Sequence, residues 1–282
     1  MFKSYRLFDI HGIPIKVHGS LPLFLILAGL LINLGGGVSG FVLTVLLWTL
    51  AFGCVLLHEL GHALAARRYG IPVREITLYP IGGVAALAYM PKNWRREFVI
   101  AIAGPAVNFA LAGLFALAYF LLPGVPGVFL GWLVAINLGL ALFNLIPGFP
   151  MDGGRILRAL LARTRSYYRA TKIAVDVGRN VAIGMGALGF LSIFMPLASP
   201  MLLPISIFIY FAAKAELTRV ALEERLGHAD PLTSFFFPDA GVSAGQSTTY
   251  GRPEAPRVFT WTFRNEAPTS TRRGGNGRII DL

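Results

Sequence analysis

Charge is scarce in this chain of 282 residues. Only 14% of the residues are Asp, Glu, Lys or Arg, whereas 55% are hydrophobic and the mean hydropathy is +0.64. This composition excludes an ordinary soluble domain and is typical of a membrane protein that crosses the bilayer several times.

Cysteine is nearly absent, and the single Cys54 excludes an internal disulfide framework. A signal-peptide pattern is also missing, because a lead-in with Lys3, Arg6, Asp9 and Lys16 precedes the first apolar run. We therefore expect that run to be retained as an anchor.

Long stretches contain no charged residue at all. These stretches cover residues 17–57, 98–151 and 180–213. Each is interrupted by a segment rich in Gly and Pro, at 35–40, 122–127 and 195–200. Because one membrane helix needs about 20 residues, the pattern predicts about six transmembrane helices, of which the last two must borrow flanking residues. The expected fold is an all-α polytopic membrane domain over residues 1–226, with core spans at about 41–165.

The basic residues are distributed unevenly. All 25 Lys and Arg residues fall in four segments, residues 1–19, 67–96, 155–179 and 214 onward, and the alternate loops have none. Since Lys and Arg accumulate on the cytoplasmic side, both termini are expected there, in a multi-pass protein of the cell membrane. The net charge of +11 then reflects topology and contact with anionic lipid headgroups. No nucleic-acid partner is expected, because the charge is spread over four segments on one membrane side.

Residues 58–62 read His-Glu-Leu-Gly-His inside an apolar helix predicted over 41–68. Residues four apart share a helix face, so His58 and His62 can offer two imidazole nitrogens to one Zn²⁺ ion. Glu59 is then placed beside the metal, where it can take a proton from water. The alternative is two core histidines with a surface glutamate, but the apolar neighbours leave no polar face for that glutamate. Cys54 lies one turn before His58, and we interpret it as a packing residue.

Zinc at a catalytic site needs a third protein ligand. Apart from Glu59, Asp152 is the acidic residue at the edge of an apolar run. It follows a segment, 144–151, that contains two prolines and cannot continue a regular helix. Irregular backbone at membrane depth is tolerated where it lines a cavity, so the break could turn Asp152 towards the histidines. Alternatively, Asp152 caps the helix that follows.

The two motifs together resemble the site-2 protease family of intramembrane zinc metalloproteases. They are His58-Glu59-Leu60-Gly61-His62 and Asn144-x-x-Pro147-x-x-Pro150-x-Asp152-Gly153-Gly154, and the resemblance covers about residues 15–225. It implies that His58, His62 and Asp152 bind zinc and that Glu59 is the general base. It also implies hydrolysis of a peptide bond within or near the transmembrane segment of membrane-protein substrates.

The resemblance extends to further residues. Asn144 matches a family asparagine associated with substrate or transition-state contact, and Asn137 is a weaker candidate for that role. Either could simply form hydrogen bonds between helices. The segment Gly104-Pro105-Ala-Val-Asn108 is also similar to the family core, where we expect it to serve packing and not chemistry.

The segment 76–89 has two short apolar strands around Gly82-Gly83, which predicts a β-hairpin. An exposed strand edge can capture an extended peptide by main-chain hydrogen bonds. The resemblance supports a re-entrant hairpin on the cytosolic side that clamps substrate, with Gly82 and Gly83 as substrate-binding residues. The alternative is an ordinary cytosolic hairpin. A further β-strand is possible at 13–17.

The C-terminal segment differs in composition. From residue 239 it is rich in Gly, Pro, Ser, Thr and Arg, so we expect residues 227–282 to be a largely disordered cytosolic tail. Arg257–Phe263 is an exception, with strand-like alternation of aromatic residues. Neither a PDZ nor a CBS module is expected, and the sequence carries no signal for an oligomeric state. Two other functions are conceivable, a non-catalytic zinc-binding scaffold or sensor and a transporter with discontinuous helices.

Overall fold

The computed structural model describes residues 3–32, 37–122, 124–195 and 199–226. All of them belong to one compact unit. The expected tail at 227–282, including Arg257–Phe263, lies outside the described residues.

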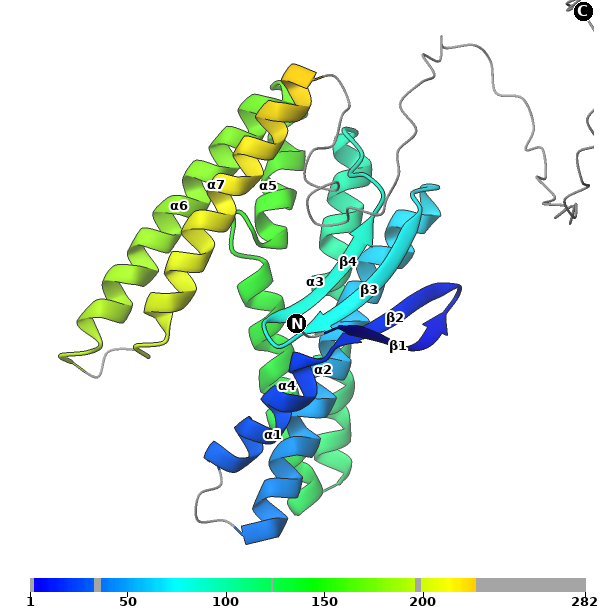
Figure 1. Ribbon diagram of the computed structural model, residues 1–282, viewed down its shortest axis with the longest axis vertical. Helices are drawn as coiled ribbons and strands as arrows, with labels where there is room; N and C mark the ends of the chain where they lie inside the picture. The colour runs from blue at the N-terminus through cyan, green and yellow to red at the C-terminus, as the bar shows by residue number, and fades with distance from the viewer. Residues whose placement is uncertain (1–2, 33–36, 123, 196–198, 227–282) are drawn as a thin grey trace, which may run out of the picture. The chain divides into compact units, whose positions relative to one another are not determined.

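The described residues form four strands and seven helices (Figure 1). In chain order they are β1 (Ser4–Ile10), β2 (Ile13–His18), α1 (Ser20–Ile32), α2 (Gly37–Arg68), β3 (Val73–Tyr79), β4 (Gly82–Leu87), α3 (Trp94–Leu121), α4 (Val125–Asn144), α5 (Asp152–Leu161), α6 (Tyr167–Leu191) and α7 (Leu202–Leu226).

In the part of the chain that the structure describes, four helices, α2, α3, α4 and α6, are long and apolar enough to cross a membrane. The predicted count of about six is therefore not confirmed. Within the described residues, the first apolar run gives the 13 residues of α1, which at 1.5 Å per residue extend about 20 Å, less than the roughly 30 Å hydrocarbon core. Helix α7 is long, but charged residues from Lys214 onward occupy its second half. As predicted, α6 is completed by flanking residues, since it begins at Tyr167.

The long helices expose apolar side chains. In an apolar stretch of 18 residues in each helix, only 17% of the residues of α2 and 33% of those of α3 are buried inside the protein. On α3, Leu114 and Leu117 are each 60% exposed and Phe120 is 80% exposed. Exposed apolar surface of this extent is typical of a lipid-facing helix, so the arrangement fits a membrane protein.

The sheet is larger than the predicted hairpin, and "all-α" is too narrow a description. Its strand order is β1-β2-β3-β4, with antiparallel pairs at both ends and a parallel pair between β2 and β3. The possible strand at 13–17 is confirmed as β2. The hairpin of β3 and β4 is also confirmed, but Gly82 and Gly83 are the first residues of β4, where they pair with Tyr79 and Leu78. Strand β1 was not predicted from the sequence, because its side chains are mostly exposed and its residues do not alternate between apolar and polar.

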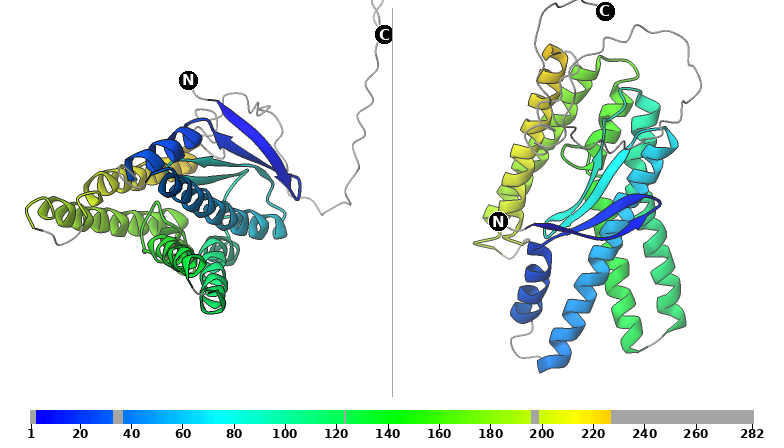
Figure 2. Two further views of the ribbon diagram at one scale, coloured as in Figure 1. Left: turned by 90° about the horizontal axis from the view of Figure 1, so that it is seen from below. Right: turned by 45° about the vertical axis from the view of Figure 1, so that its right-hand side comes forward.

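Helix α2 is the central element. It contacts α1, α3 and α4, and β3 and β4 lie along it. Figures 1 and 2 show α6 and α7 side by side as a pair that connects to the other helices through α5. The short helix α5 contacts both α3 and α6, and so it joins the two groups of helices.

The loop before α5 is anchored on the pair of α6 and α7. Phe149 packs in a cluster with α6 and α7 residues, and Met151 packs in a second such cluster. A Cβ added to Gly148 would lie 2.3 Å from the Cα of Gly178, so the loop and α6 are in direct backbone contact. The prolines prevent helix formation here, and these contacts decide where α5 begins.

Helix α5 is held by a buried ion-pair cluster. Arg158, which is 1% exposed, pairs with Glu97 of α3 at 2.6 Å and with Glu216 of α7 at 2.8 Å. Its guanidinium carbon also lies 4.7 Å from the centre of the Phe149 ring and 4.8 Å from that of Tyr167. Breaking a buried pair leaves an uncompensated charge, so this cluster fixes α5 between α3 and α7.

Replacing the central cation should destabilise the protein strongly. We expect Arg158→Met to lower the free energy of unfolding by about 3–5 kcal/mol, because Glu97 would remain buried without its partner. Unfolding in detergent micelles would measure this. Arg6→Met is the control, since Arg6 pairs with Asp9 on an exposed strand and its loss should leave stability unchanged. Equal stability of the two variants would show that the cluster does not hold α5.

Candidate metal centre

Helix α2 places two imidazoles on one face, one turn apart. His58 and His62 are buried, at 6% and 7% exposure, and their ring centres are 4.7 Å apart. The helix continues without interruption through both residues to Arg68. The i, i+4 spacing in the sequence therefore becomes the expected pair of nitrogens facing one point.

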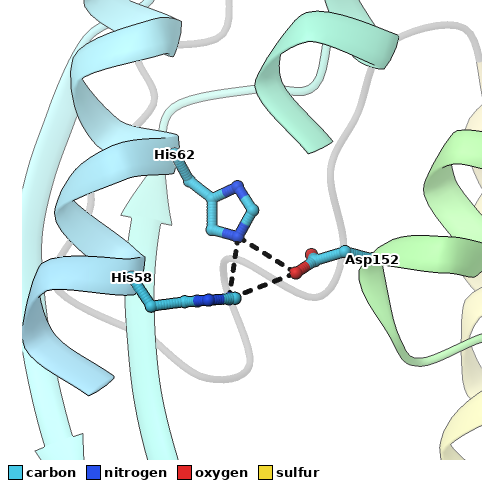
Figure 3. Close-up of side chains that lie close together, drawn as sticks. All are labelled: His58, His62 and Asp152. Atoms are coloured by element: carbon cyan, nitrogen blue, oxygen red, sulfur yellow. Dashed lines mark hydrogen bonds and ion pairs between the residues drawn. The ribbon is translucent and has the colours of Figure 1, made fainter. Parts of the chain in front are cut away.

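The first residue of α5 completes the group (Figure 3). Asp152 Oδ2 lies 3.2 Å from His58 Nε2 and 3.1 Å from His62 Nε2, and the two Nε2 atoms are 3.1 Å apart. Met151 occupies the N-cap position of α5, so Asp152 is not the capping residue of this helix.

The opposite nitrogen of each imidazole has its own partner. His62 Nδ1 lies 2.6 Å from the backbone carbonyl oxygen of Ile100 on α3. His58 Nδ1 contacts the Oδ1 of Asn108, also on α3. A carbonyl oxygen accepts, so the Nδ1 of His62 is the donor and its Nε2 lone pair points at the shared position.

The arrangement fits a tetrahedral metal ion. Bonds of about 2.0–2.1 Å separate tetrahedral ligand atoms by about 3.3–3.4 Å, close to the 3.1–3.2 Å observed among these three atoms. Two imidazole nitrogens and one carboxylate oxygen form a donor set that suits zinc. Space for the ion depends on Gly104 of α3, because a Cβ there would lie 2.2 Å from His62 Nε2 and 2.7 Å from His58 Nε2.

The side chains of His58, His62 and Asp152 line a cavity of about 380 Å³. Glu59, Asn144, Gly82, Gly83 and Arg155 line the same cavity. Its volume is within the range of small-molecule binding sites.

Strand β4 lies close to the glutamate. A Cβ added to Gly83 would lie 2.5 Å from Glu59 Cγ, so the side chain of Glu59 rests against the Gly83 backbone. Any larger residue at this position would displace Glu59.

All but one of the residues named as site candidates therefore line one cavity. Asn137, the weaker candidate, does not, because it is 0% exposed and hydrogen-bonds between helices. Cys54 accepts a hydrogen bond from Asn137 and is outside the group of three, in agreement with a packing role. The segment 104–108 was expected to serve only packing, yet Gly104 and Asn108 both face the histidines. Its resemblance to the family core was the available signal.

Residues 46–128 and 124–185 match peptidase family M50. The solved structure of the site-2 protease from Methanocaldococcus jannaschii is 40% identical, with a TM-score of 0.57, and the match covers 76% of this chain and 95% of that one. The chain belongs to peptidase family M50, the site-2 protease family.

Two curated relatives are also similar to this M50 chain. Zinc metalloprotease MJ0392 of M. jannaschii is 41% identical over 223 residues, which are 78% of this chain and 62% of the relative. Rip3 of Mycobacterium tuberculosis is 38% identical over 232 residues, 76% of this chain and 59% of the relative. The chain thus spans about six tenths of the length of these relatives. Membership in family M50 gives no support to the scaffold or transporter alternatives.

The space at Gly104 gives a direct test of the metal position. We expect Gly104→Ala to abolish stoichiometric zinc binding, because the new methyl group would overlap the ligand nitrogens. Elemental analysis of the purified protein would measure zinc content. Gly113→Ala is the matched control on the same helix, since a Cβ there meets nothing within 4 Å. Full zinc content in Gly104→Ala would contradict this placement of the ion.

Proposed function

We propose that this chain is an intramembrane zinc metalloprotease that hydrolyses a peptide bond within or near the transmembrane segment of membrane-protein substrates. One observation carries the proposal. His58 Nε2, His62 Nε2 and Asp152 Oδ2 converge within 3.2 Å of one another, and Glu59 lines the same cavity, among helices apolar enough to cross a membrane.

In this proposal His58, His62 and Asp152 would hold the zinc ion. Zinc bound there would supply a Lewis acid that polarises a peptide carbonyl and activates water. The ligands reach it from two elements, α2 and the start of α5, so the site forms only when both are in place.

Glu59 is the proposed general base. It follows His58 directly, lines the cavity, and its side chain is restrained by Gly83 of β4. From there its carboxylate accepts a proton from water and later returns it to the departing amine of the cleaved peptide bond.

Strand β4 is the proposed contact for the substrate backbone. It is an edge strand of the sheet, and Gly82 and Gly83 line the cavity. An edge strand offers unpaired N–H and C=O groups to an extended peptide, and glycines let that peptide approach closely. Asn144, at the end of α4, faces the same cavity and is proposed to contact the substrate or the transition state.

The basic segments are proposed to lie on the cytoplasmic side, together with both termini. Side-chain contacts support a common face for all four. Arg67 donates to the His11 carbonyl, Arg163 stacks on Trp94 at 4.9 Å, and Arg158 pairs with Glu216 at 2.8 Å. Because Lys and Arg concentrate on the cytoplasmic side, this face is the one expected in the cytosol.

The proposed membrane domain covers residues 1–226, with residues 227–282 as a cytosolic tail. Helices α1 and α7 are proposed as the two further membrane segments that bring the total to six. The first half of α7, up to Ala213, carries no charge, and α1 carries none over its whole length.

Loss of the general base should separate turnover from metal binding. We expect Glu59→Gln to reduce cleavage of a tagged single-span membrane substrate by about 10²–10⁴-fold or more, with zinc content unchanged. Purified wild type and variant would be compared at matched zinc occupancy, with a chelator added to a parallel sample. Glu224→Gln, an exposed change on α7, is the control and should cleave at the wild-type rate.

The result can also contradict the proposal. Equal cleavage by wild type and Glu59→Gln would remove Glu59 from its role. Full zinc occupancy without cleavage of any of several single-span substrates would argue for a non-catalytic metal protein.

Orientation can be tested by labelling. In a Cys54→Ala background, Ser199→Cys should react with a membrane-impermeant maleimide on intact cells, because the loop before α7 is placed outside the cytosol. Arg163→Cys should react only after permeabilisation, because its loop is placed inside. Both positions are exposed in the protein, so accessibility depends on the membrane side. The reverse labelling pattern would overturn the orientation.

A further inference from the structure

A buried line of polar side chains runs from the candidate metal site to α4. His58 Nδ1 contacts Asn108 Oδ1, and Asn108 Nδ2 donates to Asn137 Oδ1 at 2.8 Å. Asn137 Nδ2 in turn donates to the backbone carbonyl of Leu133 at 2.9 Å and lies 3.3 Å from Cys54 Sγ. Both asparagines are 0% exposed. The line therefore joins α2, α3 and α4 away from the cavity.

The direction of these hydrogen bonds is fixed at the far end. A backbone carbonyl oxygen can only accept, so Asn137 must turn its NH₂ group to Leu133 and its Oδ1 to Asn108. Asn108 must then turn its NH₂ group to Asn137 and its Oδ1 to His58. Reversing either amide would set two acceptors or two donors against each other in a site that water does not reach.

The direction decides the state of His58. Its Nδ1 faces an acceptor, so the proton of the neutral ring is on Nδ1 and the Nε2 lone pair points at Asp152 and His62. His62 obtains the same tautomer directly from the Ile100 carbonyl. A backbone carbonyl thus determines the tautomer of each histidine. It acts directly on His62, and through the side-chain amides of Asn137 and Asn108 on His58.

We propose that Asn108 and Asn137 are positioning residues for the metal: they form a relay that holds His58 in the tautomer and ring orientation that bind zinc. The inference rests on the zinc site of the proposed function but not on proteolysis. Partners of this kind behind a metal-binding histidine typically contribute 10–100-fold in metal affinity.

The relay also accounts for the placement of these residues on α3. Asn108 lies one turn after Gly104, so one face of α3 leaves room at the Nε2 atoms and supplies the acceptor at Nδ1 of His58. A lone asparagine would be free to present either end of its amide to the ring. The second asparagine on α4 removes that freedom.

Zinc affinity of the purified full chain in detergent tests the relay, by titration against a chromophoric zinc chelator. We expect Asn108→Leu to weaken zinc binding about 10–100-fold. Asn137→Leu should weaken it by a smaller factor, because Asn108 remains but can turn over. The double variant should match Asn108→Leu alone, because Asn137 acts through Asn108.

Two control variants separate the relay from general destabilisation. Thr171→Val removes a buried side-chain hydrogen bond on α6, away from the site. Cys54→Ala removes the contact between Asn137 and the Cys54 sulfur. A thiol can be donor or acceptor, so this contact does not set the direction of the hydrogen bonds in the relay. Both should keep wild-type zinc affinity.

The outcomes are distinct. Wild-type affinity in a folded Asn108→Leu variant, or losses that multiply in the double variant, would overturn the relay. A loss of affinity in Thr171→Val equal to that in Asn108→Leu would do the same. If wild type binds zinc without cleaving any substrate, the expected pattern of affinities would uphold the relay while protease function fails. Absence of zinc binding by wild type would overturn both.

Discussion

Close packing of α2 against α3 is the constraint on which the site depends. Helix α2 carries both histidines, but α3 supplies the space and the hydrogen-bond acceptors behind them. A Cβ at Gly61 would lie 2.9 Å from the Ala103 carbonyl oxygen, and one at Gly104 would overlap the histidine nitrogens. Small residues at this crossing let the backbones approach, as in membrane helix packing generally. With bulkier residues the ring of each histidine would lose its carbonyl partner and the position for an ion.

The second requirement is that a carboxylate reaches the histidines from the opposite side. That depends on α5, which is too short to hold its own place and is anchored at both ends. The loop before it is fixed on α6 and α7 through Phe149 and Met151, and Arg158 is buried between Glu97 and Glu216. Buried charges are costly unless paired, so a displacement of α5 would separate these ion pairs and cost free energy. Asp152 is presented to the site as a consequence of that anchoring.

Each imidazole of the candidate metal site has a hydrogen-bond partner behind it. His62 is satisfied by a backbone carbonyl, and His58 is satisfied through Asn108 and Asn137. The arrangement leaves the Nε2 atoms and the Asp152 carboxylate facing one point, next to a cavity that also contains Glu59. The same chain of contacts that stabilises the helices therefore prepares the site for a cation, which is why fold and chemistry are hard to separate here.

The sequence by itself determined what depends on local spacing. Uncharged runs gave the long helices, and the interval between His58 and His62 put both on one helix face, because helix geometry is the same wherever the helix is placed. Asp152 was found because few acidic residues border an apolar run, although its helix could have used it as a cap.

The tertiary structure alone decided that Gly104 leaves room for an ion, that Asn108 and Asn137 stand behind His58, and that β1 joins the sheet. The two asparagine contacts link residues 50 and 29 positions apart, and the room for an ion depends on a side chain that is missing; periodicity carries no record of either. Uncharged runs alone did not settle the number of membrane helices, since α1 has only 13 described residues and α7 carries charges from Lys214 onward.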